Sequence, residues 1–287
     1  MKIFGIGVSG LVGSRIVELL RDKYQIDNLS LDTGVDITNP ETLDVIRNDK
    51  DHEIVLHLAA KADVDGCEAD KSLGKDGAAY KINAGGVENV INSCKESSKK
   101  IIYVSTDFVF DGENNPDEGY TEEDNPNPIN WYSETKYEGE KIVKNSGLEF
   151  LIIRLAYPYQ QKDFELKKDF VHAIMNRLKN NQQVMAITDH IMTPTFLDDF
   201  AAAIDVLIQN DSTGIYHTVG SEALTPYDAT LMIADKFNLD KSLINKTTRA
   251  EYFKNKAPRP FNLTMNNDKI EKLGVKMKTF SEGLELI

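Results

Sequence analysis

The sequence contains no long apolar segment, since no stretch approaches the roughly 18 consecutive apolar residues that a membrane-spanning helix needs. Cysteine is scarce: Cys67 and Cys94 are the only two, and they lack Cys-x-x-Cys spacing. This usage argues against a disulfide scaffold and is typical of a reducing compartment, so we expect a cytoplasmic protein. Histidine is also scarce, and its five copies show no paired ligand spacing, so we predict no metal site.

Positive charge is in deficit. The chain has 33 lysines and arginines against 46 aspartates and glutamates, which gives a net charge of −13. Such a surface repels nucleic-acid backbones and acidic membranes, so neither is an expected partner. A small anionic ligand remains compatible with this charge, because a helix N-terminus can hold phosphate locally. The apolar stretch at the N-terminus is too short for a signal peptide, and we expect none.

Three glycines follow the first predicted strand, Lys2–Ile6, and precede a helix with apolar residues at helical spacing. In Gly7-x-x-Gly10-x-x-Gly13 the first glycine permits a tight turn, the second a close approach of backbone to a pyrophosphate, and the third close helix packing. This strand–turn–helix context predicts a dinucleotide site. The residues expected to bind the cofactor in the turn are Gly7, Ser9, Gly10, Leu11, Val12 and Gly13.

A second predicted strand, Leu29–Leu31, ends at Asp32. A carboxylate there can accept hydrogen bonds from a ribose 2′-hydroxyl and would repel a 2′-phosphate, so the expected cofactor is NADP or NAD, with a slight lean to NAD. An ordinary turn at Asp32-Thr33-Gly34 is an equal alternative. Arg15, near the start of the first helix, would either meet phosphate or lie in solvent.

Helices alternate with further predicted strands, at Glu53–Leu58, Lys100–Val104 and Leu148–Arg154. This alternation predicts an α/β fold with a doubly wound parallel sheet of the Rossmann type. Leu58, Ala59 and Ala60 would leave room for the cofactor at the edge of the sheet. The hydroxyls of Ser105 and Thr106 would lie where such sheets bind ligands.

Tyr132 and Lys136 follow a long polar loop, Phe110–Asn130, and project from one face of a predicted helix. A tyrosine has a pKa of about 10, and one positive charge about 4 Å away could bring it near 7. Such a phenol can exchange a proton with a substrate oxygen at neutral pH. The same spacing also arises by chance where the tyrosine packs and the lysine is solvated, so its meaning depends on its surroundings.

The alternation of strand and helix changes beyond Tyr157. We predict a dinucleotide-binding domain over residues 1–156, to which the helix and strand of residues 196–219 return. Residues 157–195 and 220–287 would form a small C-terminal substrate-binding lobe. Within it, Pro258-Arg259-Pro260 would be a rigid extended segment bearing one cation.

Together these motifs resemble the extended short-chain dehydrogenase/reductases, and within them the dTDP-4-dehydrorhamnose reductase branch. The resemblance covers nearly the whole chain. Its specific elements are the run from Ser105 to Gly112 (Ser-Thr-Asp-Phe-Val-Phe-Asp-Gly) and the late Pro258-Arg259-Pro260. The wider superfamily shares the rest: the glycine turn, Asp36-Ile37-Thr38, Ala59-Ala60 with Val64-Asp65, Asn83, Tyr132-x-x-x-Lys136 with Gly139-Glu140, and Thr193-Pro194-Thr195.

The resemblance implies a catalytic set of Thr106, Tyr132 and Lys136, with Asn83 as a fourth member that holds a water. It also implies that Tyr132 and Lys136 contact the cofactor, Lys136 through the nicotinamide ribose. Residues implied near the adenine end are Asp36 and Ile37, and those implied on the substrate side are Thr106, Asp107, Phe108 and Arg259. Three departures from the branch, Ser133, His190 and Met192, are expected to alter the substrate side.

The expected activity is NAD(P)H-dependent reduction of a 4-keto nucleotide sugar, as in dTDP-rhamnose biosynthesis. Two alternatives remain at this stage: a nucleotide-sugar epimerase or dehydratase that uses the same residues, and a non-catalytic NADP-binding subunit resembling the regulatory β subunit of methionine adenosyltransferase. The sequence leaves the oligomer open, with a homodimer as one option.

Overall fold

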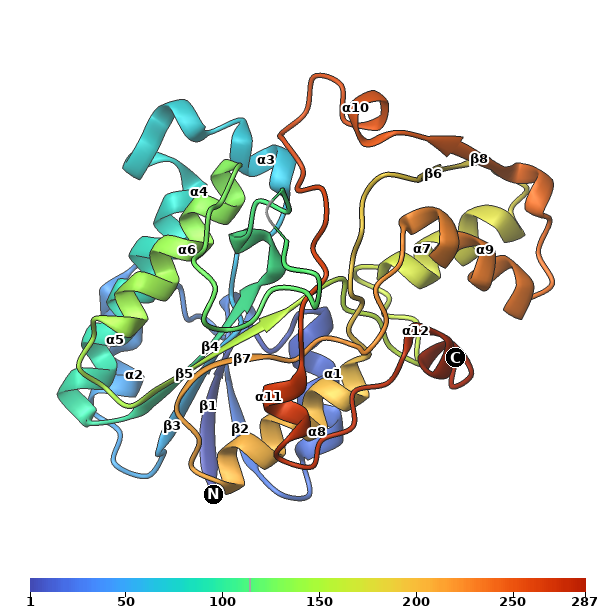
Figure 1. Ribbon diagram of the computed structural model, residues 1–287. Coiled ribbons are helices and arrows are strands. Elements are labelled where there is room, and N and C mark those ends of the chain that lie inside the picture. The colour runs from blue at the N-terminus through green and yellow to red at the C-terminus, as the bar shows by residue number, and fades with distance from the viewer. Residues whose placement is uncertain (114) are drawn as a thin grey trace.

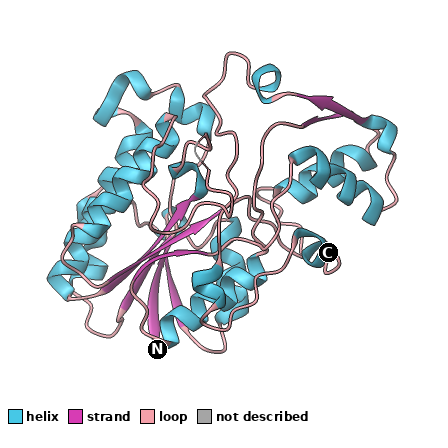
Figure 2. Ribbon diagram, in the orientation of Figure 1, coloured by secondary structure: helices cyan, strands magenta, loops and turns pink. Residues whose placement is uncertain are grey.

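The computed structural model describes residues 1–113 and 115–287. Its central sheet has six parallel strands in the order β2-β1-β3-β4-β5-β7, drawn as magenta arrows in Figure 2. The strands of this sheet are β1 (Lys2–Ile6), β2 (Gln25–Leu29), β3 (Ile54–His57), β4 (Lys100–Thr106), β5 (Phe150–Leu155) and β7 (Gly214–His217). This arrangement is the predicted doubly wound α/β sheet.

Helices cover both faces of the sheet (Figure 1). One face buries Ile3, Leu56 and Ile153 against α1 (Leu11–Leu20) and α8 (Leu197–Gln209). The other face packs against α2 (Asp44–Arg47), α5 (Gly86–Ser97) and α6 (Trp131–Lys144). Because side chains alternate along each strand, neighbouring residues of one strand enter opposite cores, which explains the near-continuous apolar strands.

The strand order reverses between β1 and β3, since β2 lies on one side of β1 and β3 on the other. At this switch point the turn after β1 meets the chain after β3. A Cβ at Gly7 would lie only 2.6 Å from the backbone nitrogen of Ala59, and Gly7 has a φ of +77°. Open α/β sheets bind ligands at the carboxyl ends of the strands at such a point.

A smaller unit stands beside the sheet, at the right of Figure 1. Its two parallel strands, β6 (Val184–Ile187) and β8 (Ile244–Thr247), pair with each other rather than with the main sheet. Helices α7 (Phe170–Lys179) and α9 (Pro226–Lys236) belong to the same smaller unit and pack around a separate apolar cluster. Strand β7 pairs with β5 in the main sheet. The domain bounds given above stay a prediction.

The described chain also contains further short α-helices. They are α3 (Val64–Glu68), α4 (Ala78–Tyr80), α10 (Arg249–Tyr252), α11 (Asp268–Glu271) and α12 (Phe280–Leu284). Within these described residues, no helix is both long and apolar enough to cross a membrane.

The second strand differs from the prediction. It spans Gln25–Leu29, and Leu31–Thr33 forms a short 3₁₀ turn capped by Ser30. As the first strand in the sheet order, β2 is an edge strand, so part of it faces water and carries polar residues that hide the strand pattern. Strand β8 was not predicted. Of the predicted loop Phe110–Asn130, Asn114 lies outside the described residues.

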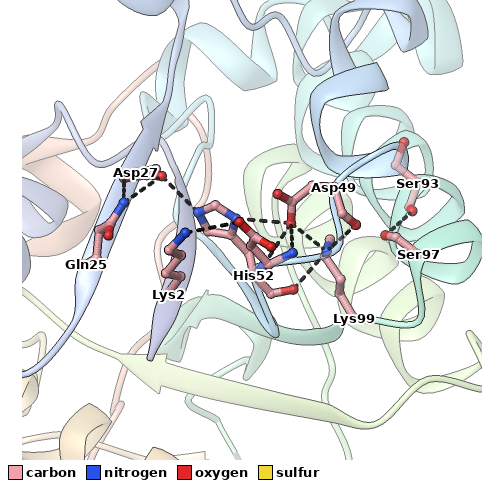
Figure 3. A network of polar contacts seen from close by, with 9 residues as sticks. Lys2, Gln25, Asp27, Asp49, His52, Ser93, Ser97 and Lys99 are labelled. Atoms are coloured by element: carbon pink, nitrogen blue, oxygen red, sulfur yellow. Dashed lines mark hydrogen bonds and ion pairs between the residues drawn. The ribbon is translucent and has the colours of Figure 1, made fainter.

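A network of polar contacts lies at the N-terminal ends of the sheet strands (Figure 3). Lys99 is buried, and its ammonium donates to the Asp49 carboxylate at 3.0 Å and to the His52 carbonyl at 2.8 Å. His52 stacks on Phe4 with ring centroids 3.6 Å apart. Burial alone would raise the pKa of Asp49, but hydrogen bonds from the His52 backbone and from Lys99 hold that pKa well below its usual value.

Candidate active site

The glycine turn can accept a pyrophosphate. Gly10 is the N-cap of α1, and the first N–H groups of a helix have no intrahelical partner, so they are available to an anion. A Cβ at Gly13 would lie 2.3 Å from Val8 Cα, so only glycine allows α1 to pack this closely on the turn. Leu58, Ala59 and Ala60 follow β3 and are partly exposed beside the turn. These positions fit a dinucleotide.

Arg15 does neither of the two things expected of it. Its guanidinium makes a bidentate contact with Asp198, at 2.7 Å for both hydrogen bonds, and a third bond to Glu18. The side chain is 5% exposed and joins α1 to the start of α8. It is therefore a structural clamp, which could not be read from sequence because its partner lies 183 residues away.

The acidic residues after β2 have different surroundings. Asp32 is exposed and accepts hydrogen bonds from the Ser9 hydroxyl at 2.8 and 2.9 Å, so the glycine turn holds this carboxylate. One oxygen of Asp36 accepts from both the backbone and the hydroxyl of Thr38. The Ile37 side chain is buried in the core, so a contact of Ile37 with adenine would use its backbone.

The end of β4 presents a threonine beside a buried acid. The Thr106 hydroxyl donates to Asp107 at 2.8 Å and accepts from the Phe108 N–H at 3.2 Å. Asp107 is 2% exposed, and its second carboxylate oxygen has no hydrogen-bond partner among the described residues. Burial raises the pKa of Asp107 to about 7 against the opposing hydrogen bond from Thr106. Burial therefore favours the protonated form of this acid.

Tyr132 lies in the first turn of α6, whose start is fixed by Asn130. The Asn130 side chain accepts from the Ser133 N–H at 2.9 Å, and the Ser133 hydroxyl completes a capping box. The Tyr132 ring meets the Phe108 ring edge-on, with centroids 6.1 Å apart. Burial raises the pKa of the Tyr132 phenol, while its contact with the Thr106 hydroxyl lowers it. Thr106 and Tyr132 thus lie together.

Lys136 is 2% exposed, one helical turn beyond Tyr132. Its ammonium donates to the Val104 carbonyl at 2.8 Å and lies 4.2 Å from the centroid of the Tyr103 ring. Burial lowers the pKa of Lys136 to about 7, against the attraction of Glu140. The expectation that Lys136 brings the pKa of Tyr132 towards 7 is therefore wrong for this structure, because burial acts on both groups and the ammonium is paired with Val104.

Asn83 occupies a π-helical turn, Lys81–Gly85, and is fully buried. Its amide donates to the Lys61 carbonyl at 3.1 Å and to the Thr135 hydroxyl at 3.0 Å, and it accepts from the Lys61 N–H at 2.8 Å. These bonds use both amide hydrogens. Asn83 thus ties the chain after β3 to α6, and its predicted role in holding a water stays a prediction.

Arg259 is bound within the protein. Its guanidinium donates to Asp65 at 2.8 Å and to the Ala257 carbonyl at 2.7 Å, and it stacks over the Phe253 ring at 4.5 Å. The side chain is 10% exposed. Asp65 lies in the first turn of α3, so this ion pair links the Pro258-Arg259-Pro260 segment to α3.

Tyr157, which was not predicted as a site residue, and His190, which was predicted only as a departure on the substrate side, contact each other in this region. The Tyr157 hydroxyl lies 2.9 Å from His190 Nε2, and His190 Nδ1 lies 2.8 Å from the Pro260 carbonyl. Of the three residues that depart from the branch pattern, His190 is the one whose side chain forms a hydrogen-bond chain with Tyr157 and Pro260. Ser133 caps α6, and Met192 is buried with its backbone paired to Leu224. A histidine at position 190 was the only sequence signal for this pair.

The comparisons with known proteins agree with this geometry. The probable low-salt glycan biosynthesis reductase of Haloferax volcanii is 29% identical, covering 99% of this chain and 96% of the relative. The mouse methionine adenosyltransferase 2 subunit beta is also 29% identical, over 88% of this chain and 74% of the relative. The solved dTDP-4-dehydrorhamnose reductase of Bacillus anthracis, in complex with NADP, is 28% identical with a TM-score of 0.88, covering 99% of this chain and 97% of that one.

The family comparison covers the same length. The family model described as the RmlD substrate binding domain matches residues 1–287. The resemblance to the dTDP-4-dehydrorhamnose reductase branch is confirmed, as is the Rossmann-type fold. The chain belongs to the RmlD substrate binding domain family.

Proposed function

We propose that the protein is an NAD(P)H-dependent reductase of a 4-keto nucleotide sugar, similar to dTDP-4-dehydrorhamnose reductase. The observation that carries this proposal is the arrangement at the end of β4. The Tyr132 ring contacts Phe108, two residues beyond Thr106, and Lys136 lies one helical turn along α6 from Tyr132. The glycine turn lies at the switch point of the same sheet. A dinucleotide bound there would supply the hydride, and the protein would supply orientation and a proton.

Tyr132 is the proposed proton donor to the oxygen that becomes the alkoxide. Reduction requires a protonated phenol, and burial keeps Tyr132 protonated because it raises its pKa. The Thr106 hydroxyl is the second group directed at this oxygen. Its proton points to Asp107, so protonation of Asp107 frees Thr106 to donate to the substrate.

Lys136 is proposed to hold the nicotinamide ribose, with its ammonium fixed by Val104. The lobe formed by residues 157–195 and 220–287 is proposed to bind the nucleotide sugar, and Arg259 is proposed to contact its phosphate or the loop that does. Asp32 favours NAD over NADP, although the Bacillus anthracis relative was solved with NADP. A homodimer and a cytoplasmic location are part of this proposal.

The test is single-turnover oxidation of NADH or NADPH by dTDP-4-dehydrorhamnose, followed by loss of nicotinamide absorbance. Tyr132→Phe should keep cofactor affinity and lose a general-acid factor of roughly 10² to 10⁴ in rate. Tyr137→Phe, on the same helix, is the matched control and should behave as wild type. Normal cofactor binding without turnover of any 4-keto sugar nucleotide would favour a regulatory subunit. A rate unchanged by Tyr132→Phe would show that another group gives the proton.

A further inference from the structure

Tyr157 is held in an unusual backbone conformation beside the active site. It follows β5 by two residues and has a φ of +39°, in the left-handed region that a bulky side chain rarely adopts. Such strain persists where the surrounding structure imposes it, and it concentrates at functional sites. The ring packs edge-on against Phe170 at 5.9 Å, which fixes its direction.

The hydrogen-bond chain from Tyr157 has a defined polarity. The Pro260 carbonyl can only accept, so His190 Nδ1 must carry the proton in its 2.8 Å contact. Burial lowers the pKa of His190 to about 4, so the neutral ring has a bare lone pair at Nε2. The Tyr157 hydroxyl, 2.9 Å away, must therefore donate to Nε2. Its own oxygen then has only lone pairs left to offer.

Tyr157 lies at the same end of the sheet as the reacting groups. Tyr132 and Tyr157 pack against one apolar cluster, which includes Phe108 and Val109. Burial raises the pKa of both phenols, the Asp107 carboxylate raises each pKa further, and Arg259 lowers that of Tyr157. Strand β5 pairs with β4 up to Thr106, so the residues just beyond these strands lie at the same end of the sheet. Tyr157 is also partly exposed.

We propose that Tyr157, oriented by His190, is a specificity-determining residue that accepts a hydrogen bond from a hydroxyl group of the sugar. The inference deepens the proposed function and rests on it. A sugar with a hydroxyl at the matching carbon satisfies the lone pairs of Tyr157. A sugar with a carbonyl or ether oxygen there would set lone pairs against lone pairs, and a deoxy sugar would leave the phenol oxygen without a donor.

The experiment compares dTDP-4-dehydrorhamnose with its 2-deoxy and 3-deoxy analogues. For wild type, removal of one of these hydroxyls should lower kcat/KM by roughly 10- to 100-fold. For Tyr157→Phe, the parent sugar should lose the same factor, and the analogue should lose nothing further. Tyr159→Phe is the matched control, because that phenol is fully buried and its hydroxyl has no hydrogen-bond partner among the described residues. It should keep the wild-type selectivity.

A second pair of variants tests the polarity. In His190→Gln the amide can donate to Pro260 and still accept from Tyr157, so selectivity should be retained. In His190→Phe the Tyr157 proton becomes free, and selectivity should fall while the melting temperature reports that the fold is kept. Equal selectivity in wild type and Tyr157→Phe, or none in wild type, would overturn the inference.

Failure of the proposed function is distinguished by a binding readout. Calorimetric titration of the cofactor-bound protein with dTDP-rhamnose and its deoxy analogues measures the same selectivity without turnover. Selectivity in binding that depends on Tyr157 supports the inference even if no reduction occurs, in which case only the proposed reductase activity is wrong. Binding without selectivity overturns the inference itself.

Discussion

The Lys136 ammonium donates to the carbonyl oxygen of Val104 at 2.8 Å and does so from a position that is 2% exposed. One backbone carbonyl and the face of Tyr103 are the described partners that hold it in place. Burial lowers the pKa of this lysine to about 7, so charging it costs free energy in the folded protein. A buried lysine with a lowered pKa in such a position is typical of a group that serves a ligand.

Replacement of Lys136 by methionine should therefore raise the free energy of unfolding of the cofactor-free protein and lower its catalytic rate. The unfolded chain binds more protons than the folded one between about pH 7 and its reference pKa of about 10.4, so wild-type stability rises with pH across this window. The variant should gain on the order of 2 kcal/mol in free energy of unfolding at pH 7 and almost nothing above pH 10.4. Urea unfolding at the two pH values measures this.

The activity of the same variant separates two roles of Lys136. Loss of the ammonium should weaken cofactor binding and lower the rate, whereas Tyr132→Phe should lower the rate alone. Lys141→Met is the control, because Lys141 is half-exposed and pairs with Glu138 on the outside of α6. A gain in stability over wild type that is absent at pH 7, or that is as large above pH 10.4 as at pH 7, would contradict this account of the Lys136 charge.

We expect the cofactor preference to depend on Asp32. Since its carboxylate is fixed by the Ser9 hydroxyl, it should accept from a ribose 2′-hydroxyl and repel a 2′-phosphate. We expect NADH to bind wild type at least as tightly as NADPH, and Asp32→Ala to shift the ratio of dissociation constants towards NADPH by roughly tenfold, or about 1.4 kcal/mol. Titration of both cofactors in one buffer measures the ratio. A clear NADPH preference in wild type would show that Asp32 faces away from the ribose.

Arg259 is expected to act on the sugar nucleotide and not on the cofactor. Arg259→Ala should raise KM for the sugar nucleotide with cofactor affinity unchanged, because a lost phosphate contact weakens ground-state binding. Its ion pair with Asp65 offers a control. If Arg259 acts only as a strut, Asp65→Ala should be as damaging and the double variant no worse. An equal loss of cofactor affinity in Arg259→Ala would show that Arg259 acts on the cofactor site and not on the sugar-nucleotide site.

The polar network of Lys99, Asp49 and His52 at the N-terminal ends of the strands should make the free energy of unfolding sensitive to acid. The pKa of Asp49 is lowered on folding, so its contribution is present above its unfolded pKa of about 4 and is lost as pH falls through the folded value. Asp49→Asn should cost on the order of 2 kcal/mol at pH 7, and less at pH 3. Asp51→Asn is the control, since Asp51 is exposed and its pair with Lys2 should contribute under about 1 kcal/mol. Chemical unfolding at both pH values decides.

Local patterns were enough to predict the glycine turn, the buried strands and the Tyr132 helix. Each depends on residues close in sequence, such as Gly7 to Gly13 between a strand and a helix. The edge strand β2 was misplaced because its exposed residues carry no apolar pattern. The span of β2 is set by its pairing with β1, which is a contact between segments that are not adjacent in sequence.

The partners of charged side chains could not be predicted in the same way. Arg259 meets Asp65 across 194 residues, and Tyr157 meets His190 across 33. Such contacts depend on how the lobe and the sheet are placed against each other. The predicted lowering of the Tyr132 pKa was wrong for a related reason. The charge of Lys136 was visible in the sequence, but the burial that raises the pKa of the phenol was not.

The clamp between Arg15 and Asp198 has an electrostatic consequence. This cation is bound to two carboxylates, so the glycine turn would meet the proposed cofactor through backbone dipoles, without the charge of Arg15. An anionic cofactor then approaches a chain whose net charge is −13. Salt shortens the range of that repulsion from about 30 Å at 0.01 M to about 8 Å at 0.15 M. Dilute buffer would therefore hinder the cofactor, and moderate ionic strength would speed its arrival, the reverse of the usual effect of salt on phosphate recognition.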